Sequence, residues 1–309
     1  MITIISVTAE APAPQPKPAW LKIRPPTNTA QVNHIKTLTQ TFNLHTVCQE
    51  SKCPNIAECW SHGTATFMIM GDTCTRACKF CHVKTKFPAK PLDPDEPQKL
   101  AAAIKHLQLT YAVITSVTRD DLPDQGALHI AKCITELKET MPNLLVEILI
   151  PDFKGNEDCL KTIVHARPHV IAHNIETVKS LQRKVRDPRA GYDQSLRILR
   201  NVKELNPLIL TKSSLMLGLG ETPEEVHQAF HDLRAHQVDI VTLGQYLQPS
   251  ADLLPVHAYI TPDQFAAYQK AAEDAGFLYA IAGPFVRSSY RAGELFIEHV
   301  INRSAHGPH

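Results

Sequence analysis

The cysteines constrain this chain more than any other feature of its sequence. Six of its eight cysteines lie between residues 48 and 81, in two triads with the spacings Cys48-x4-Cys53-x5-Cys59 and Cys74-x3-Cys78-x2-Cys81. Three thiolates that converge on one point can hold an iron–sulfur cube, and a four-iron cube takes four donors. Each triad would therefore leave one iron open to another ligand.

Two other interpretations of the triads have to be weighed. Structural zinc sites usually pair their ligands as two CxxC knuckles or combine cysteine with histidine, and the second triad does neither cleanly. Disulfides are a weaker alternative still, because a chain of 309 residues can build a core without them and shows no secretory signal. Iron–sulfur chemistry is the favoured interpretation, with zinc as its main rival.

Charge and hydropathy exclude several other classes of function. The net charge is +1, from 32 basic and 31 acidic residues, which gives no electrostatic argument for a nucleic-acid partner. No run approaches the roughly 18 apolar residues of a membrane span. Residues 1–7 lack both the basic flank of a signal peptide and the arginines of a mitochondrial presequence. We therefore expect a cytoplasmic enzyme, in a reducing compartment where cluster thiolates survive.

The pattern along the chain predicts an α/β protein with extensions at both ends. Residues 1–18 contain a proline-rich stretch and are expected to be disordered. Residues 19–62 form an N-terminal extension with one helix near 30–42 and the first cysteine triad. Residues 63–283 alternate short β-branched runs with amphipathic segments, as parallel βα units do. Residues 284–309 form a C-terminal segment.

Six βα units predict a partial (β/α)6 barrel. The predicted strands are 66–70, 111–117, 144–150, 169–173, 208–217 and 239–245, and the predicted helices are 96–108, 126–140, 156–166, 193–205, 222–236 and 262–275. Two of these helices have strong start signals, because Thr222 and Thr261 are each followed by proline and, three residues on, by Glu225 or Gln264.

A parallel barrel carries its chemistry at the carboxyl ends of its strands, so the strand list predicts where a site would lie. The second triad follows the first strand. Polar residues follow the others: Thr115, Ser116, Arg119, Asp120 and Asp121; Glu147 and Asp152; Asn174 and Glu176; Lys212, Ser213, Ser214 and Glu221; Gln245 and Tyr246. Cys133 and Cys159 lie in predicted helices without cluster spacing, and we expect them to be apolar packing residues.

The residues around the triads carry a resemblance to a known family. Cys74-x3-Cys78-x2-Cys81 resembles the signature of the radical S-adenosylmethionine (SAM) enzymes. The segment from His45 to Trp60 is similar to the auxiliary-cluster motif of the lipoyl synthases, and Arg287-Ser-Ser-Tyr290 is similar to their C-terminal motif. The three matches occur in the family's order and cover most of the chain, from about residue 20 to about residue 293.

The resemblance implies a barrel of the radical SAM type with two 4Fe-4S clusters and SAM as cofactors. Cys74, Cys78 and Cys81 would hold the cluster that binds SAM. Cys48, Cys53 and Cys59 would hold an auxiliary cluster, with Ser289 preferred over Ser288 as its fourth ligand. The resemblance also suggests SAM contacts for Thr115, Ser116, Asn174, Glu176 and Ser214, although Ser214 stands where the family's motif usually has glycine.

The implied reaction is the insertion of two sulfur atoms, at C6 and C8, into an octanoyl group on a lipoyl carrier domain. The implied partners are an octanoylated dehydrogenase E2 domain or glycine-cleavage H protein, and an electron donor such as flavodoxin or ferredoxin. Two alternatives stay open. One is another radical SAM enzyme, with an auxiliary cluster for electron transfer or methylthio transfer. The other is a non-enzymatic scaffold that binds zinc or a cluster.

Overall fold

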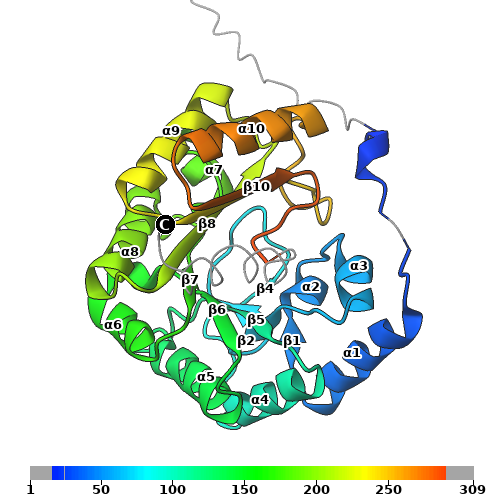
Figure 1. Ribbon diagram of the computed structural model, residues 1–309, viewed down its shortest axis with the longest axis vertical. Helices are drawn as coiled ribbons and strands as arrows, with labels where there is room; N and C mark the ends of the chain where they lie inside the picture. Colours follow the sequence, from blue (N-terminus) through cyan, green and yellow to red (C-terminus); the bar gives the residue numbers. More distant parts are fainter. Residues whose placement is uncertain (1–15, 24, 290–309) are drawn as a thin grey trace, which may run out of the picture.

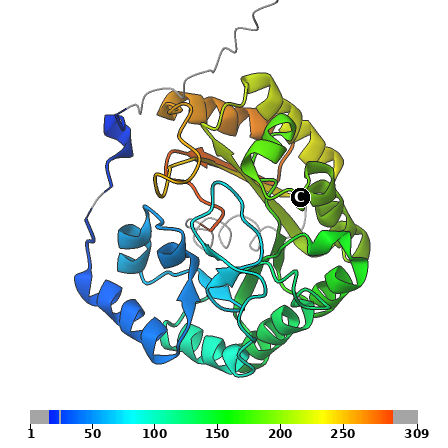
Figure 2. The same ribbon diagram turned by 180° about the vertical axis from the view of Figure 1, so that it is seen from behind.

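A ring of parallel strands with helices around it forms the body of the protein (Figures 1 and 2). The computed structural model describes residues 16–23 and 25–289. Its main sheet has eight strands in the order β1-β2-β5-β6-β7-β8-β9-β10, and every neighbouring pair from β2 to β10 is parallel. The predicted α/β fold of the partial-barrel type is confirmed. Most of the predicted disordered N-terminus, and the C-terminal segment beyond Ser289, lie outside the described residues.

All six predicted strands are present. They are β2 (Phe67–Ile69), β5 (Tyr111–Ser116), β6 (Leu145–Leu149), β7 (Val170–Ala172), β8 (Leu210–Leu217) and β9 (Ile240–Gln245). A further parallel strand that the sequence did not predict, β10 (Tyr279–Gly283), pairs with β9. A separate two-stranded sheet consists of β3 (Thr73–Cys74) and β4 (Lys84–Thr85).

The helices that follow the strands cover the outside of the sheet (Figure 1). The predicted ones are α1 (Thr29–Thr41), α4 (Glu96–His106), α5 (Ala127–Thr140), α6 (Glu157–His165), α8 (Tyr192–Leu205), α9 (Pro223–Ala235) and α10 (Pro262–Asp274). Both predicted capping boxes are confirmed at the starts of α9 and α10. Three short helices were not predicted: α2 (Val47–Glu50), α3 (Ile56–Ser61) and α7 (Gln182–Val185).

The core lies between the strands and these helices. The three residues of β2 and the six of β9 are all buried, as expected for strands covered on both faces. The inner faces of the helices supply the other half of the core, for example Leu100 and Ile104 of α4 and Phe230 of α9. Among the described residues, no helix combines the length and the apolar character needed to cross a membrane.

The N-terminal extension is joined directly to the barrel sheet. Its strand β1 (His45–Thr46) pairs antiparallel with β2, with His45 opposite Met68 and Thr46 opposite Phe67. Thr46 then caps α2 by accepting a hydrogen bond from the Gln49 backbone. The first cysteine triad therefore begins at the edge of the same sheet whose next strand leads into the second triad.

Candidate active site

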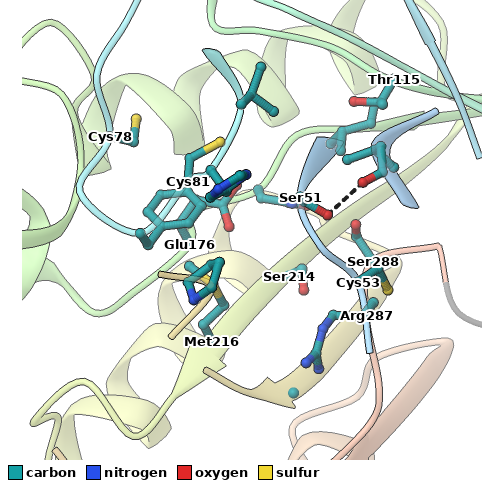
Figure 3. Close-up of a pocket in the computed structure, with 18 of the residues that line it drawn as sticks. Ser51, Cys53, Cys78, Cys81, Thr115, Glu176, Ser214, Met216, Arg287 and Ser288 are labelled. Carbon is teal, nitrogen blue, oxygen red and sulfur yellow. Dashed lines mark hydrogen bonds between the residues drawn. The ribbon is translucent and has the colours of Figure 1, made fainter. Parts of the chain in front are cut away.

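The carboxyl ends of the strands surround one cavity of about 500 Å³ (Figure 3). Five of the six clustered cysteines line it, and so do all the polar residues for which SAM contacts were suggested. The lining includes Cys48, Cys53, Cys74, Cys78, Cys81, Thr115, Ser116, Asn174, Glu176, Ser214, Ser288 and Ser289. The sixth cysteine, Cys59, lies in α3 and is not part of the lining. Three motifs and three strand ends that are far apart in the sequence thus meet in one place.

A sharp turn after β2 directs the chain into the second triad. Met70 and Gly71 both have positive φ angles, +67° and +87°. The Met70 backbone N–H donates to the Glu96 carboxylate at 2.8 Å, and that carboxylate also lies 2.6 Å from Nε2 of His129. The buried Glu96 and His129 pair therefore fixes the turn that precedes the ligand loop.

Two backbone N–H groups approach sulfur atoms of the second triad. The N–H of Arg76 donates to Cys74 Sγ at 3.4 Å, and that of Asp187 donates to Cys78 Sγ at 3.3 Å. Burial is the main cause that raises the pKa of Cys78 to about 11 and that of Cys81 to about 12, with smaller contributions from Cys74 to both and from Cys78 to Cys81. Buried thiols that repel one another as thiolates, and that accept backbone N–H donors, suit a positively charged metal core.

A buried charge network fixes the loop between Cys74 and Cys78. The Arg76 guanidinium forms two hydrogen bonds to each of two aspartates: Nε and Nη2 to Asp120 at 2.9 and 3.0 Å, and Nη1 and Nη2 to Asp152 at 2.7 and 2.8 Å. These aspartates follow β5 and β6. Arg189 adds a bond from Nη2 to the Thr75 carbonyl at 2.8 Å, and Asp187 accepts from the Ala77 N–H at 2.9 Å. Three strand-to-helix connections therefore hold one cluster loop.

The thiols of the first triad are gathered over two short helices. Cys48 lies in α2, Cys59 lies in α3 and Cys53 lies between them. Burial raises the pKa of Cys59 to about 12, with further contributions from Cys48 and Cys53, and burial with the neighbouring Cys53 raises that of Cys48 to about 11. The three thiols are thus close enough to act on one another electrostatically. Three convergent soft donors fit an iron–sulfur cluster.

The C-terminal motif reaches the first triad from the far end of the chain. The side-chain amide of Asn55 donates to the Phe285 carbonyl at 2.6 Å, across 230 positions of sequence. Ser288 and Ser289 line the cavity that Cys53 also lines, and Figure 3 shows Ser288 beside Arg287. Tyr290, the last residue of the motif, lies outside the described residues. The structure therefore brings hydroxyl groups of this motif to the cavity, while the choice of Ser289 as ligand stays a prediction.

The loops of the two triads are also joined to each other. Nδ1 of His82, the residue after Cys81, lies 3.0 Å from the carbonyl oxygen of Glu50, which stands between Cys48 and Cys53. Through this contact the second ligand loop rests on the first. Two cluster sites built in this way would face one cavity at a fixed separation.

Orphaned polar atoms mark the part of the cavity beside the second triad. Ser116 Oγ and Asn174 Oδ1 are buried and have no hydrogen-bond partner among the described residues. Burial raises the pKa of Glu176, against the opposing effects of Arg186 and Asn174. Buried polar atoms without partners are rare and indicate a ligand that would satisfy them. These residues suit the polar amino, carboxylate and hydroxyl groups of a molecule such as SAM.

Several other candidates from the strand ends do not line the cavity. Glu147 and Lys212 form a buried ion pair at 2.8 Å, to which Tyr111, the first residue of β5, donates its hydroxyl at 2.6 Å. Both lie two residues before cavity-lining positions of their strands, so they point inward at a deeper level. Arg119 pairs with Asp121, and Ser213 accepts from the Ile175 N–H. These residues lie outside the cavity lining and make their contacts within the barrel.

The fold and the site agree with the comparison to known proteins. A model of the Radical SAM superfamily matches residues 68–233, which include the whole second triad. The fold is similar to that of HydG, a maturase of the [FeFe]-hydrogenase, with a TM-score of 0.56, 13% identity and coverage of 70% of this chain and 50% of that one. It is also similar to methylornithine synthase, with a TM-score of 0.52, 12% identity and coverage of 84% of each chain. The class of protein defined by fold and site is the radical SAM superfamily, whose members use a 4Fe-4S cluster and SAM.

Sequence relatives narrow the class to one family. Lipoyl synthase of Methanocella arvoryzae is 55% identical over 91% of this chain and 95% of that relative. The lipoyl synthase of Thermus thermophilus is 53% identical over 93% and 88%, and the mitochondrial enzyme of Schizosaccharomyces japonicus is 50% identical over 93% and 77%. The chain belongs to the lipoyl synthase family.

Proposed function

We propose that this enzyme converts a protein-bound octanoyl group into a lipoyl group by inserting sulfur at C6 and C8. When bound, the SAM cluster supplies the electron that cleaves SAM to a 5′-deoxyadenosyl radical, and the auxiliary cluster supplies sulfur. The observation that carries the proposal is that cysteines of both triads line one cavity of about 500 Å³. A carbon radical formed there would meet a sulfur source without leaving the cavity.

Two groups of residues, on different sides of the cavity, would bind SAM and the auxiliary cluster. Residues 63–283 would bind SAM through Cys74, Cys78 and Cys81, with Thr115, Ser116, Asn174, Glu176 and Ser214 around it. Residues 19–62 and the segment from 284 would hold the auxiliary cluster through Cys48, Cys53, Cys59 and Ser289. A hard serine oxygen matches iron in a sulfide cluster less well than a thiolate does, so this ligand could be released as sulfur is withdrawn.

The apolar part of the cavity lining would also protect the reaction. A primary carbon radical attacks whatever lies nearest, so the chain must exclude water and hold the octanoyl carbon in contact with its target. Apolar side chains such as Met68, Leu149, Leu215 and Met216 line the cavity beside the cysteines. They would hold an alkyl chain without offering competing polar groups.

The proposed substrate is an octanoylated carrier, either a dehydrogenase E2 domain or the glycine-cleavage H protein. An electron donor such as flavodoxin or ferredoxin would reduce the SAM cluster. We place this activity in the cytoplasm, and neither a nucleic acid nor a membrane takes part in it.

The test is anaerobic turnover of a defined substrate. The protein is reconstituted with iron and sulfide, mixed with SAM, a strong reductant and an octanoyl-lysyl peptide, and the peptide is followed by mass spectrometry. We expect a gain of two sulfur atoms with loss of the matching hydrogens. Deoxyadenosine without thiolated peptide would point to another radical SAM reaction, and neither product from fully loaded protein would refute the proposal.

Cys53→Ala is the matched variant for the auxiliary site. It leaves the second triad intact, so we expect SAM binding and some deoxyadenosine formation but no lipoyl product. Continued sulfur insertion by this variant without an external sulfur donor would contradict the role given to the first triad.

A further inference from the structure

Arg287 lies against the first triad and has no acidic partner among the described residues. It follows β10, lines the cavity and is half-buried, and Figure 3 shows its side chain below Cys53. Its hydrogen bonds run from Nη1 to two carbonyl oxygens of its own segment, those of Val286 at 2.6 Å and Pro284 at 3.4 Å. A guanidinium has five N–H donors, so Nε and Nη2 remain available to another group.

The charge of this guanidinium is not balanced by any carboxylate in residues 16–23 and 25–289, where Arg287 forms no ion pair. The Arg287 guanidinium is close enough to the Cys53 thiol for the two groups to interact electrostatically, and both residues line the cavity. The buried guanidiniums of Arg76 and Arg119, by contrast, each pair with aspartate. A partly desolvated cation is costly unless an anion lies beside it.

The backbone is shaped to keep Arg287 in this position. Gly244 of β9 lies so close to the segment that an added Cβ would stand 1.9 Å from the Val286 carbonyl oxygen and 3.1 Å from Arg287 Nη1. Only glycine permits this approach. Together with the bond from Asn55 to Phe285, this contact fixes the segment from both sides.

We propose that Arg287 is the counter-charge of the auxiliary cluster and a positioning residue for it. The assignment rests on the proposed function, because it needs a cluster on the first triad. A [4Fe-4S]²⁺ core with three thiolates and an alkoxide carries a net charge of about −2. A guanidinium beside the Cys53 thiolate stabilises that charge, and it favours the more negative reduced state still more. Arg287 therefore raises the reduction potential of the cluster and slows its loss.

The test isolates the auxiliary cluster in the full-length chain. In a parent variant with Cys74, Cys78 and Cys81 replaced by alanine, the first triad is the one cysteine triad left to hold an iron–sulfur cluster. Two quantities are measured: the midpoint potential, by redox titration followed by electron paramagnetic resonance, and the rate at which a chelator removes iron. The substitutions are Arg287→Gln, Arg287→Lys and, as a control, Arg200→Gln, whose residue forms an exposed ion pair with Glu204 on α8.

We expect Arg287→Gln to release iron about tenfold faster, the factor that about 1.4 kcal/mol represents, and to shift the potential to a more negative value. Arg287→Lys keeps the charge and should stay close to the parent, as should the control. An unchanged rate and potential in Arg287→Gln would overturn the assignment. So would equal losses in Arg287→Gln and Arg287→Lys, because these would reflect the backbone hydrogen bonds and not the charge.

Two outcomes separate this inference from the proposed function. A parent variant that takes up no iron would overturn the auxiliary cluster itself, and Arg287 with it. A parent that loads fully and is indifferent to Arg287→Gln would leave the proposed function in place and overturn only the role of Arg287. If Arg287→Gln does not fold, Arg287→Lys decides alone: parent-like iron retention supports the charge, and rapid loss refutes it.

Discussion

Replacing Arg76 by methionine should destabilise the protein by about 3–5 kcal/mol, the usual cost of removing one partner of a buried ion pair. The Arg76 side chain is 5% exposed, and those of Asp120 and Asp152 are 1% and 0% exposed. Asp120 keeps two other cations, Lys154 at 3.5 Å and Arg189 at 3.2 Å. Asp152 loses its only ion-pair partner among the described residues, so most of the cost arises there.

The pH dependence of stability gives this prediction a second signature. Burial alone would raise the pKa of Asp152, but the hydrogen bonds from Arg76 outweigh it and lower the pKa from 3.8 to about 2. A depressed folded-state pKa contributes stability above pH 3.8 that is lost as the pH falls towards 2, here about 2.4 kcal/mol. In Arg76→Met burial is opposed by only the weaker effects of His173 and the Lys154 N–H, so the sign should reverse and the variant should regain stability relative to wild type as the pH falls from 7 to 4.5.

Urea unfolding of the reduced, cluster-free protein, followed by circular dichroism at pH 7 and pH 4.5, measures both effects. Arg200→Met is the control, because an exposed pair is worth less than about 0.5 kcal/mol. The double variant Arg76→Met/Asp152→Asn should recover part of the loss, because the uncompensated charge is gone. A loss below about 1 kcal/mol at pH 7, together with a wild-type pH profile, would refute the reasoning.

Three further predictions concern other parts of the fold. In the cluster-free protein, burial raises the pKa of Cys48 from 9.0 to about 11, so this thiol stabilises the fold below pH 9 and the stabilisation is lost as the pH rises towards 11. Between pH 8 and pH 10 the free energy of unfolding should therefore fall by about 1.4 kcal/mol. Cys48→Ala should abolish this decrease. Gly244→Ala should displace the segment at Val286 and reduce the iron content of reconstituted protein from about eight to about four per chain, while Gly191→Ala, whose Cβ has room, should keep both clusters. Lys212→Met should cost about 3–5 kcal/mol in urea unfolding by leaving Glu147 buried and unpaired, and a wild-type midpoint would contradict this.

The parts of the fold that could be predicted carry local signals. Neighbouring residues alone define the β-branched runs of the six predicted strands. The same is true of the capping boxes at Thr222 and Thr261. The strand β10 was missed because its sequence, Tyr-Ala-Ile-Ala-Gly, has small residues and only one buried position, so it does not form a strong apolar run. The helices α2 and α7 have four residues each, which is too short for a helical period to show.

The candidate site, like the fold, has parts that local sequence patterns predict and parts that they do not. The spacing of the cysteines is a local pattern, so their grouping could be predicted, and five of the six line the cavity. The two aspartates that pair with Arg76 are 44 and 76 residues away in the sequence, and no local pattern predicts ion pairs over such separations. Whether Glu147 and Lys212 reach the cavity depends on their positions along β6 and β8 relative to the ends of the neighbouring strands. Those relative positions are set by the register between strands, which exists only in the assembled barrel.

The contact between Asn55 and Phe285 has a consequence for the order of events during synthesis. The amide of Asn55 stands between two cysteines of the first triad, and its partner emerges 230 residues later. At about 5–20 residues per second, translation of that interval takes roughly 12–46 s. During this interval Cys48, Cys53 and Cys59 have been synthesised but the segment at Phe285 has not. Iron delivered early would therefore meet a triad that this segment does not yet contact. A protein truncated before Phe285 would lack this contact, and we expect it to retain less iron on its first triad than the full chain does.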